Sequence, residues 1–239
     1  MESRAWLGVA RTSVAVEVWD ALDFCISQKG IVLLEGTYRS GKSFSTQAWC
    51  MARPGRARYV QLSAYTDETS FFRLIARSLG TASSAQLKAI EIRQRVEDAL
   101  QGQDLMLVID EAEHLMPAYA RPSCAPDRLN YIIKDLDNRG IAVALLSGLN
   151  FSRTLTNIER KLPTYGAEQF YGRLTLRKAL PESLSEKDLL AIVAHLLPKS
   201  SETTRMLLAG HAAISRGNIG AYRQARAILR RAMRAGCEL

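Results

Sequence analysis

The sequence predicts an α/β fold in which a parallel sheet lies between layers of helices. Three observations predict it: short apolar runs indicate buried strands, apolar residues recur at helical spacing between these runs, and a glycine-rich loop follows the first of them. Buried strands that alternate with helices are typical of a parallel sheet covered on both faces. The 239 residues suffice for one such domain with a small appended subdomain.

The elements expected before residue 105 alternate between the two types. An amphipathic pattern predicts a first helix over residues 14–28, and the run Ile-Val-Leu-Leu-Glu predicts a strand over 31–35. A helix over 44–51 and a short strand over 58–62 follow. Apolar residues at helical spacing predict a helix over 69–79, and after a break of small residues another helix is expected over 85–101.

The elements expected after residue 105 divide into two groups. The run Leu-Met-Leu-Val-Ile predicts a fully buried strand over 105–109, followed by a proline-containing loop, a helix over 126–138 and a strand over 141–146. Beyond Pro181 the pattern is helical only, over roughly 185–196, 201–213 and 218–235. We therefore expect an α/β core over residues 1–180 and a small C-terminal helical lid over residues 181–239.

Composition and charge limit the functional classes. The contents of 47% hydrophobic and 23% charged residues are those of an ordinary globular protein, and no apolar run is long enough to cross a membrane. The four cysteines are far apart and form no CxxC pair, which is typical of reduced thiols in a cytoplasmic protein. The net charge of +8 permits an anionic partner without requiring one.

The glycine-rich loop after the first strand carries the strongest functional signal. It fits the pattern G-x-x-x-x-G-K-[ST], whose backbone N–H groups wrap nucleotide phosphates. We expect Lys42 to reach the β- and γ-phosphates and the Ser43 hydroxyl to bind Mg²⁺. The residues expected to contact ATP are Gly36, Thr37, Tyr38, Arg39, Ser40, Gly41, Lys42, Ser43 and Phe44. A turn without function is the alternative interpretation of this loop.

Two acidic residues follow the strand over 105–109. Ligands bind at the carboxyl edge of an open parallel sheet, so Asp110 and Glu111 are expected at the edge from which the phosphate loop leaves. Asp110 suits the acid that holds Mg²⁺ through its water shell, and Glu111 suits the base that orients the attacking water. The intervening strand 58–62 and the adjacent Glu favour the additional-strand class of P-loop ATPases over kinases and GTPases. Helix-capping acids at a strand end are the alternative interpretation.

Two further catalytic contributions are expected elsewhere in the chain. After the strand over 141–146, either Asn150 or Ser147 is a candidate to contact the γ-phosphate or the water, with a simple turn as the alternative. Transfer of a phosphoryl group is also promoted by an arginine, commonly from a neighbouring subunit. Arg173 is the best candidate for it, ahead of Arg160 and Lys161, and an ordinary surface charge is the alternative.

Taken together, these residues resemble the transposition-associated AAA+ ATPases of the MuB, TniB and TnsC families. The loop GTYRSGKS is similar to their G-x-x-R-[ST]-G-K-[ST] variant, with Arg39 at the internal arginine. The segment LMLVIDEAEHL resembles their acidic strand end, GIAVALLSG their following strand, EQFYGRLTLRKAL the stretch with their arginine finger, and GNIGAYRQARAILRRA their lid helix. In one departure, Leu149 occupies a position that is commonly Asn, Thr or Gln in relatives.

The resemblance implies a P-loop NTPase fold of the AAA+ type, in which ATP and Mg²⁺ drive assembly into rings or helical filaments on double-stranded DNA. Such assemblies mark target sites and recruit or stimulate a transposase, without a membrane. Relatives contact DNA from the segments that correspond to residues 63–66 and 81–88, where Tyr65, Ser84 and Lys88 are the expected contacts. DNA held by its phosphate backbone gives strongly salt-dependent binding.

Two other classes of function stay open. The first is an AAA+ switch that acts on a protein partner, of the secretion-associated or helicase-loader type, without direct DNA binding. The second is a nucleotide-binding module of a defence system that hydrolyses ATP poorly and signals by oligomerisation. The two segments expected to meet DNA contain one basic residue, Lys88, which is the feature that keeps these alternatives open.

Overall fold

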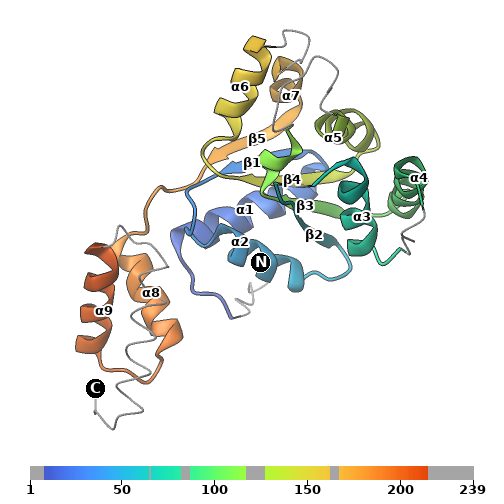
Figure 1. Ribbon diagram of the computed structural model, residues 1–239. Helices are drawn as coiled ribbons and strands as arrows, with labels where there is room; N and C mark the ends of the chain where they lie inside the picture. The colour runs from blue at the N-terminus through green and yellow to red at the C-terminus, as the bar shows by residue number, and fades with distance from the viewer. Residues whose placement is uncertain (1–7, 65, 82–86, 117–126, 162–166, 215–239) are drawn as a thin grey trace. The chain divides into compact units, whose positions relative to one another are not determined.

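The computed structural model describes residues 8–64, 66–81, 87–116, 127–161 and 167–214 (Figure 1). Contacts divide the chain into two compact units, and each is described by itself. The first unit comprises Met1–Asp20, Gly36–Ala52 and Leu180–Leu239, and the second comprises Ala21–Glu35 and Arg53–Ala179. Among the helices of the described residues, none has the length and apolar character needed to cross a membrane.

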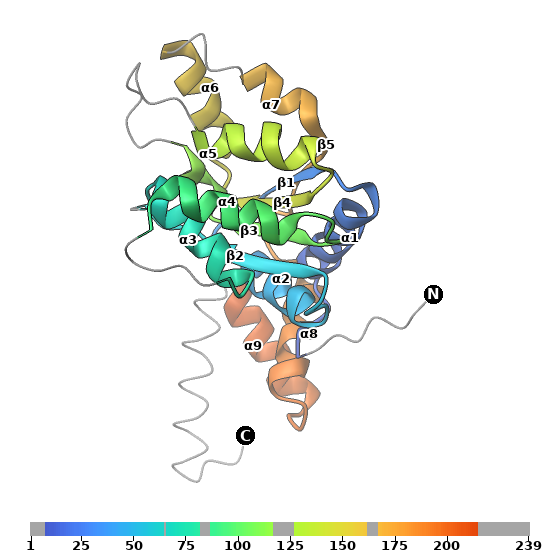
Figure 2. The same ribbon diagram turned by 90° about the vertical axis from the view of Figure 1, so that its right-hand side faces the viewer.

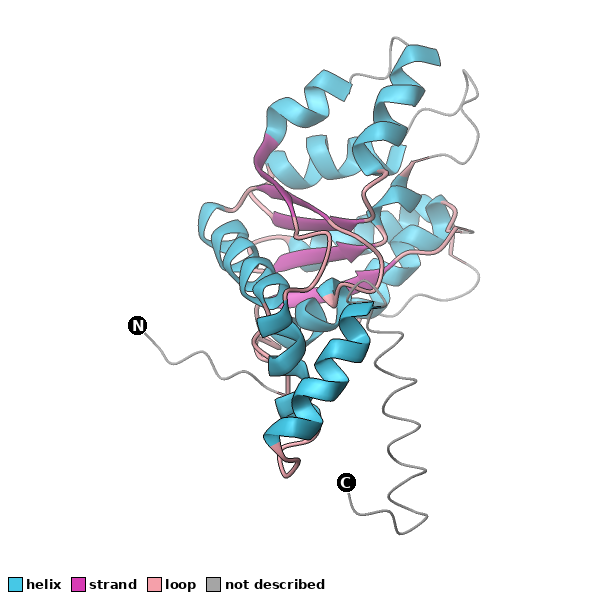
Figure 3. Ribbon diagram, turned by 90° about the vertical axis from the view of Figure 1, so that its left-hand side faces the viewer, coloured by secondary structure: helices cyan, strands magenta, loops and turns pink. Residues whose placement is uncertain are grey.

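A five-stranded sheet forms the centre of the second unit (Figure 3). Its strands are β1 (Ile31–Glu35), β2 (Ala57–Gln61), β3 (Met106–Asp110), β4 (Ala142–Ser147) and β5 (Leu174–Ala179). Every neighbouring pair is parallel, and the spatial order is β2-β3-β4-β1-β5. Strand β4 thus lies between β1 and β3, which confirms the predicted parallel sheet and its additional-strand arrangement.

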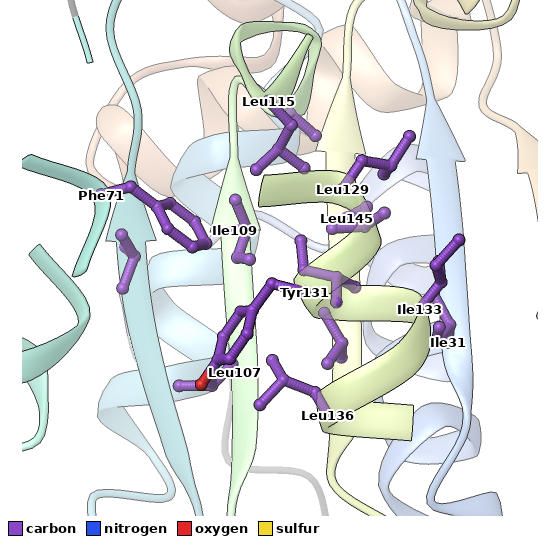
Figure 4. Close-up of a cluster of buried hydrophobic side chains, with 14 of the residues drawn as sticks. Ile31, Phe71, Leu107, Ile109, Leu115, Leu129, Tyr131, Ile133, Leu136 and Leu145 are labelled. Atoms are coloured by element: carbon purple, nitrogen blue, oxygen red, sulfur yellow. The ribbon is translucent and has the colours of Figure 1, made fainter. Parts of the chain in front are cut away.

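One face of the sheet is covered by helices that share a hydrophobic core with it (Figures 2 and 4). These helices are α3 (Glu68–Ser78), α4 (Ala89–Leu100), α5 (Asp127–Asn130), the π-helical turn η2 (Tyr131–Leu136), α6 (Phe151–Lys161) and α7 (Ala167–Arg173). The Phe72 and Tyr131 rings meet edge to face with their centroids 4.9 Å apart. Each large side chain buried here contributes about 1.5–3 kcal/mol to stability.

The opposite face of the sheet is buried as well. Successive side chains of a strand point to opposite faces, so Val108 and Ala144 lie on the face away from that core, and both are fully buried. Helix α1 (Ser13–Gln28) ends in the second unit, where Cys25 Sγ donates to the Gly30 carbonyl across 3.3 Å. Burial raises the pKa of Cys25 to about 12. The sheet therefore lies between helical layers, as the sequence predicts.

Residues 151–179 hold elements that the sequence pattern did not indicate. The described part of this stretch holds helices α6 and α7 and the edge strand β5, and β5 is exposed at every second residue. Because an edge strand has one hydrogen-bonded neighbour and partial exposure, it lacks the apolar run that identifies the central strands. The helix predicted over 126–138 is also interrupted, since it passes from α5 into the π-helical turn η2.

The first unit holds α2 (Lys42–Met51), α8 (Glu186–Leu196) and α9 (Glu202–Ile214). Two of the three predicted lid helices correspond to α8 and α9, and the third, over 218–235, lies outside the described residues. Asp188 joins α8 to the start of α1, because its carboxylate accepts from Ser13 N at 2.6 Å and from Ser13 Oγ at 2.7 Å. The division of the chain into residues 1–180 and 181–239 stays a prediction.

Candidate nucleotide-binding site

The loop between β1 and α2 has a backbone that most residue types adopt only at a cost. Arg39 has φ 64° and Gly41 has φ 95°, so both lie in the left-handed region. Glycine adopts this region freely, whereas a non-glycine residue such as Arg39 is strained there. Strain of this kind persists where the surrounding structure fixes it and is concentrated at ligand sites. The loop is therefore built to present its main chain in one particular shape.

Lys42 is the first residue of α2 and lies across this loop. Its side chain is 5% exposed, and Nζ donates to the Gly36 carbonyl across 3.3 Å and lies 5.5 Å from the centre of the Tyr38 ring. The N-cap residue of α2, Gly41, makes no side-chain capping bond, so the first N–H groups of the helix are left for another acceptor. An anion is the natural acceptor at a helix start with these features.

The remaining loop residues support the fit to a phosphate group. Ser40 is buried, and its Oγ has no hydrogen-bond partner among the described residues. A buried hydroxyl without a partner is costly, and a bound oxyanion would satisfy it. Ser43 is partly exposed at the second residue of α2, while the Tyr38 and Phe44 rings are exposed. An exposed aromatic ring offers a flat surface on which a nucleobase can stack.

Residues 180–182 hold the start of the loop in place within the first unit. A Cβ on Gly36 would lie 3.1 Å from Leu180 Cβ, so no larger residue fits there without movement of Leu180. Thr37 Oγ1 donates to the Glu182 carbonyl across 3.0 Å. The segment that leads into α8 is therefore in contact with the start of the loop.

Asp110 is the last residue of β3 and is completely buried in the second unit. Tyr59 donates its hydroxyl to Asp110 Oδ2 across 2.5 Å, and Glu111 N donates to Oδ1 across 2.9 Å. These two bonds fix the plane of the carboxylate. A buried, oriented carboxylate at the carboxyl edge of a parallel sheet is suited to hold a cation.

Glu111 follows Asp110 in the left-handed region, with φ 56° and ψ 45°. It is the N-cap of the short 3-10 helix η1 (Ala112–Leu115), where its side chain makes no capping bond. Glu111 and Arg39 are two of the three described non-glycine residues with positive φ, and the third is Lys29. Both therefore stand at positions that the sequence assigned to the nucleotide, where local strain is expected.

Glu113 and Ser147 connect the turn after β3 with the end of β4. Ser147 is fully buried, and its Oγ donates to Glu113 Oε2 across 2.7 Å. Burial alone would raise the pKa of Glu113, but hydrogen bonds from Ser147, from backbone groups of Glu113 and Gly148, and with Glu111 lower it below its ordinary value. Sequence patterns gave Glu113 no specific role, because they do not reveal its partner on another strand.

Ser147 and Asn150, the two candidates to contact the γ-phosphate, differ in whether their side chains are accessible to a ligand. The Ser147 hydroxyl is buried and engaged with Glu113, whereas Asn150 is exposed. The Asn150 carbonyl accepts from Thr154 N across 2.8 Å, which places the residue at the start of α6. Its side chain is therefore the better placed of the two to meet a ligand.

Arg173 lies where the parallel strands begin, at the end of the sheet opposite to Asp110. It ends α7 immediately before β5, whose first residue pairs with Ile31, the first residue of β1. Its Nη1 donates to Asp137 Oδ2 at 2.8 Å and to Asn138 Oδ1 at 2.9 Å. Asp110 and Glu35 end their strands at the opposite edge. Within the second unit, the structure therefore does not bring Arg173 together with Asp110 and Glu111.

Of the three expected DNA contacts, one is described. Lys88 is an exposed residue at the start of α4, and its backbone N–H donates to Glu91 Oε2 across 2.8 Å. Tyr65 and Ser84 lie outside the described residues. Lys88 is thus a surface residue, and its contact with DNA stays a prediction.

Each of the two units offers an oxygen donor of the kind that Mg²⁺ prefers. Ser43 of the first unit has a hydroxyl and Asp110 of the second unit has a carboxylate, and Mg²⁺ commonly uses one or two protein oxygens together with water and substrate phosphates. The described residues contain no group of three or more His, Cys, Asp or Glu that would hold a metal by themselves. The chemistry of each donor, taken by itself, therefore fits Mg²⁺ bound together with a phosphate ligand.

The sequence patterns did not predict one side-chain cluster at the carboxyl edge of the sheet. Glu35, Ser152 and Arg177 come from β1, α6 and β5 and form a hydrogen-bonded group. Glu35 is more than a hundred positions away from both Ser152 and Arg177 in the chain, so no local pattern relates it to them. The one sequence feature that could have indicated this cluster is the charged residue Glu35 at the end of an otherwise apolar strand. The structure shows that this glutamate is buried, with 6% of its surface exposed.

Comparisons with known proteins place the chain in a broad group. Residues 25–155, more than half of the chain, match a family model described as an AAA domain, and no curated protein matches. Cdc6p of Pyrobaculum aerophilum is similar in structure, with 17% identity and a TM-score of 0.60 over 87% of this chain and 56% of that one. A Walker-type ATPase of Pyrococcus abyssi is similar with 12% identity and a TM-score of 0.57 over 92% and 73%.

These structural likenesses concern the fold, because both identities are low. The chain spans little more than half of the Cdc6p chain that it matches. Both neighbours are consistent with a parallel sheet of the P-loop type, as found here.

Proposed function

The chain belongs to the AAA domain family, and on this premise we propose that it is an ATPase that assembles on double-stranded DNA and regulates or recruits a transposase. The observation that carries the ATPase part is the buried, oriented carboxylate of Asp110 with Glu111 beside it. Both stand where β3 ends, and the phosphate loop begins one residue after the end of β1. The resemblance to the MuB, TniB and TnsC families supports the DNA part.

The proposed chemistry assigns one task to each residue. Backbone N–H groups of residues 36–43 and the Lys42 ammonium bind the phosphates of ATP. Ser43 would hold Mg²⁺ directly and Asp110 would hold it through its water shell, and the ion would supply positive charge to neutralise the phosphates. Glu111 orients a water molecule toward the γ-phosphorus and accepts its proton. The water oxygen forms a bond to the γ-phosphorus while the bond from the γ-phosphorus to its bridging oxygen breaks, and ADP and phosphate leave.

Arg173 completes the proposed site in trans. Its place at the edge where the strands begin excludes a role beside Asp110 of the same sheet. A guanidinium that reaches a neighbouring copy's nucleotide would stabilise charge on the transferring phosphoryl group. Turnover then depends on assembly, which is the behaviour expected of a ring or filament.

A second candidate function is a switch that acts on a protein partner without contacting DNA. The observation that favours it is the scarcity of positive charge in the two segments assigned to DNA, since Lys88 is the one basic residue of residues 63–66 and 81–88. A protein that binds DNA by its phosphates normally presents several basic side chains. The eight Lys or Arg residues against two Glu in residues 199–239 are the larger basic concentration.

Sedimentation separates the two candidates. The full chain is centrifuged with a non-hydrolysable ATP analogue, with and without double-stranded DNA, at about 50 and 200 mM salt. Assembly that requires both ligands and falls steeply with salt supports the DNA-dependent ATPase. Lys42→Ala is the matched control, because it loses the phosphate contact and is expected to stay monomeric under every condition. Analogue-dependent assembly that is indifferent to DNA would favour the protein-directed switch instead.

A further inference from the structure

The carboxylate of Glu35 is buried immediately before the phosphate loop. Glu35 is the last residue of β1, is 6% exposed, and precedes Gly36 in the chain. A buried charge is retained only when it is paired and hydrogen-bonded. Its partners therefore indicate what the residue holds together.

Ser152, in the first turn of α6, donates two hydrogen bonds to this carboxylate. Its backbone N–H donates to Glu35 Oε1 across 3.1 Å, and its hydroxyl donates to Oε2 across 2.9 Å. A carboxylate at the amino end of a helix is favoured because unpaired N–H groups point outward there. The turn at residues 148–150, which contains the proposed ligand contact Asn150, lies directly before this helix.

Arg177 closes the cluster from β5. Its Nε donates to Glu35 Oε2 across 3.1 Å, and its Nη2 donates to Ser152 Oγ across 2.8 Å. The guanidinium lies 5.3 Å from the centre of the Tyr171 ring, which restricts its orientation further. One planar group thus contacts both other members, which a lysine ammonium cannot do with the same geometry.

We propose that Glu35, Ser152 and Arg177 form a positioning cluster that fixes the end of β1 to the start of α6 and thereby sets the rate of ATP turnover. The cluster joins the residue that leads into the phosphate loop to the helix that follows Asn150. None of its members is assigned a contact with the nucleotide. This inference rests on the proposed ATPase function.

A positioning role has a different kinetic effect from a binding role. Phosphate affinity depends on the loop backbone and Lys42, whereas turnover depends on the relative placement of groups to within about 1 Å, and misplacement by this amount costs up to about 10²-fold in rate. Loss of the cluster is therefore expected to lower kcat strongly and to leave nucleotide affinity nearly unchanged.

The test compares Glu35→Gln and Ser152→Ala with the wild-type full chain on double-stranded DNA. Steady-state ATP turnover gives kcat and KM, and fluorescence titration with a non-hydrolysable ATP analogue gives affinity. Glu97→Gln is the matched control, because Glu97 also forms ion pairs with two arginines, Arg93 and Arg139, but lies on α4 away from the carboxyl edge. Melting curves for all variants report folding.

We expect kcat to fall about tenfold or more in Glu35→Gln and Ser152→Ala, with analogue affinity within about twofold of wild type, and Arg177→Lys to fall between them and wild type. Glu97→Gln is expected to keep its kcat even where its melting temperature falls. Unchanged kcat in folded Glu35→Gln, or equal loss of kcat in Glu97→Gln, would overturn the inference. Absence of turnover in the wild-type chain would instead contradict the proposed function itself.

Discussion

Ser147 Oγ donates a hydrogen bond to Glu113 Oε2 across 2.7 Å, and this bond links the end of β4 to the turn after β3. Because the serine is fully buried, its hydroxyl is a structural partner of Glu113 and is withdrawn from any ligand. The bond also holds the turn that begins with Glu111. The exposed Asn150 is consequently the residue after β4 that we expect to contact the γ-phosphate.

Substitution of these two residues should separate stability from catalysis. Asn150→Ala is expected to lower ATP turnover about 10-fold or more with little change in unfolding free energy, because it removes an exposed polar group assigned to the transition state. Ser147→Ala should destabilise the chain by about 1–2 kcal/mol, because a partly buried carboxylate loses a hydrogen bond. Turnover assays and urea denaturation measure both effects, and an Asn150→Ala variant with normal turnover would remove Asn150 from the site.

The destabilisation by Ser147→Ala should depend on pH. The hydrogen bonds of Glu113 hold its folded-state pKa below its ordinary value, so its stabilising contribution is present above the unfolded-state pKa and is lost as pH falls through the folded-state value. The difference in unfolding free energy between wild type and variant is expected to be largest near pH 7 and to shrink below about pH 4. A difference that is constant from pH 7 to pH 3 would contradict this account of Glu113.

Asp188 should contribute strongly to the stability of the first unit. Its carboxylate caps α8 by accepting from Ser185 N across 3.0 Å, and it accepts two further bonds from Ser13. Asp188→Ala is expected to cost about 2–4 kcal/mol, because a buried cap and two further hydrogen bonds are lost together. Burial alone would raise the pKa of Asp188, but the bonds from Ser13 and Ser185 lower it, so the cost should again diminish at low pH.

A matched control for Asp188 is Glu186→Ala. Glu186 is the exposed first residue of α8, directly after the N-cap Ser185, and the bonds from Ser13 go to Asp188. Its loss should cost well under 1 kcal/mol in urea denaturation. Equal costs for both variants would mean that the bonds to Ser13 do not stabilise α1 against α8.

Arg173 should act across the interface between copies. If Arg173 acts on a neighbour's nucleotide as proposed, Arg173→Ala is expected to abolish ATP turnover while preserving analogue binding, because the phosphate loop of the same copy is left intact. Mixing Arg173→Ala with Glu111→Gln provides the decisive control. Sites formed between an intact Glu111 on one copy and an intact Arg173 on the other should regain part of the phosphate release. If no mixture of the two variants regains turnover above the sum of each alone, the role of Arg173 in trans is wrong.

The central strands, the edge strand β2 and the helices before residue 105 were predictable from sequence, whereas the elements of residues 151–179 were not. Strands β1, β3 and β4 are fully buried on both faces, so their apolar runs identify them directly. The edge strand β5 is partly exposed along its length, and its Thr175, Arg177 and Lys178 break the apolar run. Propensity alone also does not show the π-helical turn at Tyr131–Leu136, whose first residue packs its ring against Phe71 and Phe72 of a distant helix.

In the candidate site, the residue types were predictable from sequence, whereas their conformations and distant contacts were not. Lys42, Ser43, Asp110 and Glu111 belong to contiguous motifs whose residue types follow from phosphate and Mg²⁺ chemistry. Their conformations do not follow from the motif: the left-handed backbone of Glu111 is visible only in the structure. Bonds between distant segments, such as Ser147 with Glu113, are likewise invisible to a local pattern because they depend on the order of the strands.

The most direct test of the central claim is phosphate release by Glu111→Gln compared with wild type on double-stranded DNA, with bound nucleotide measured in the same samples. Wild type is expected to release phosphate, and its DNA-bound assemblies are expected to disappear as ATP is consumed. Glu111→Gln is predicted to release phosphate at least about 10²-fold more slowly and to sediment with DNA carrying intact ATP. Phosphate release by Glu111→Gln at the wild-type rate, or a wild-type chain that binds no ATP, would contradict the account.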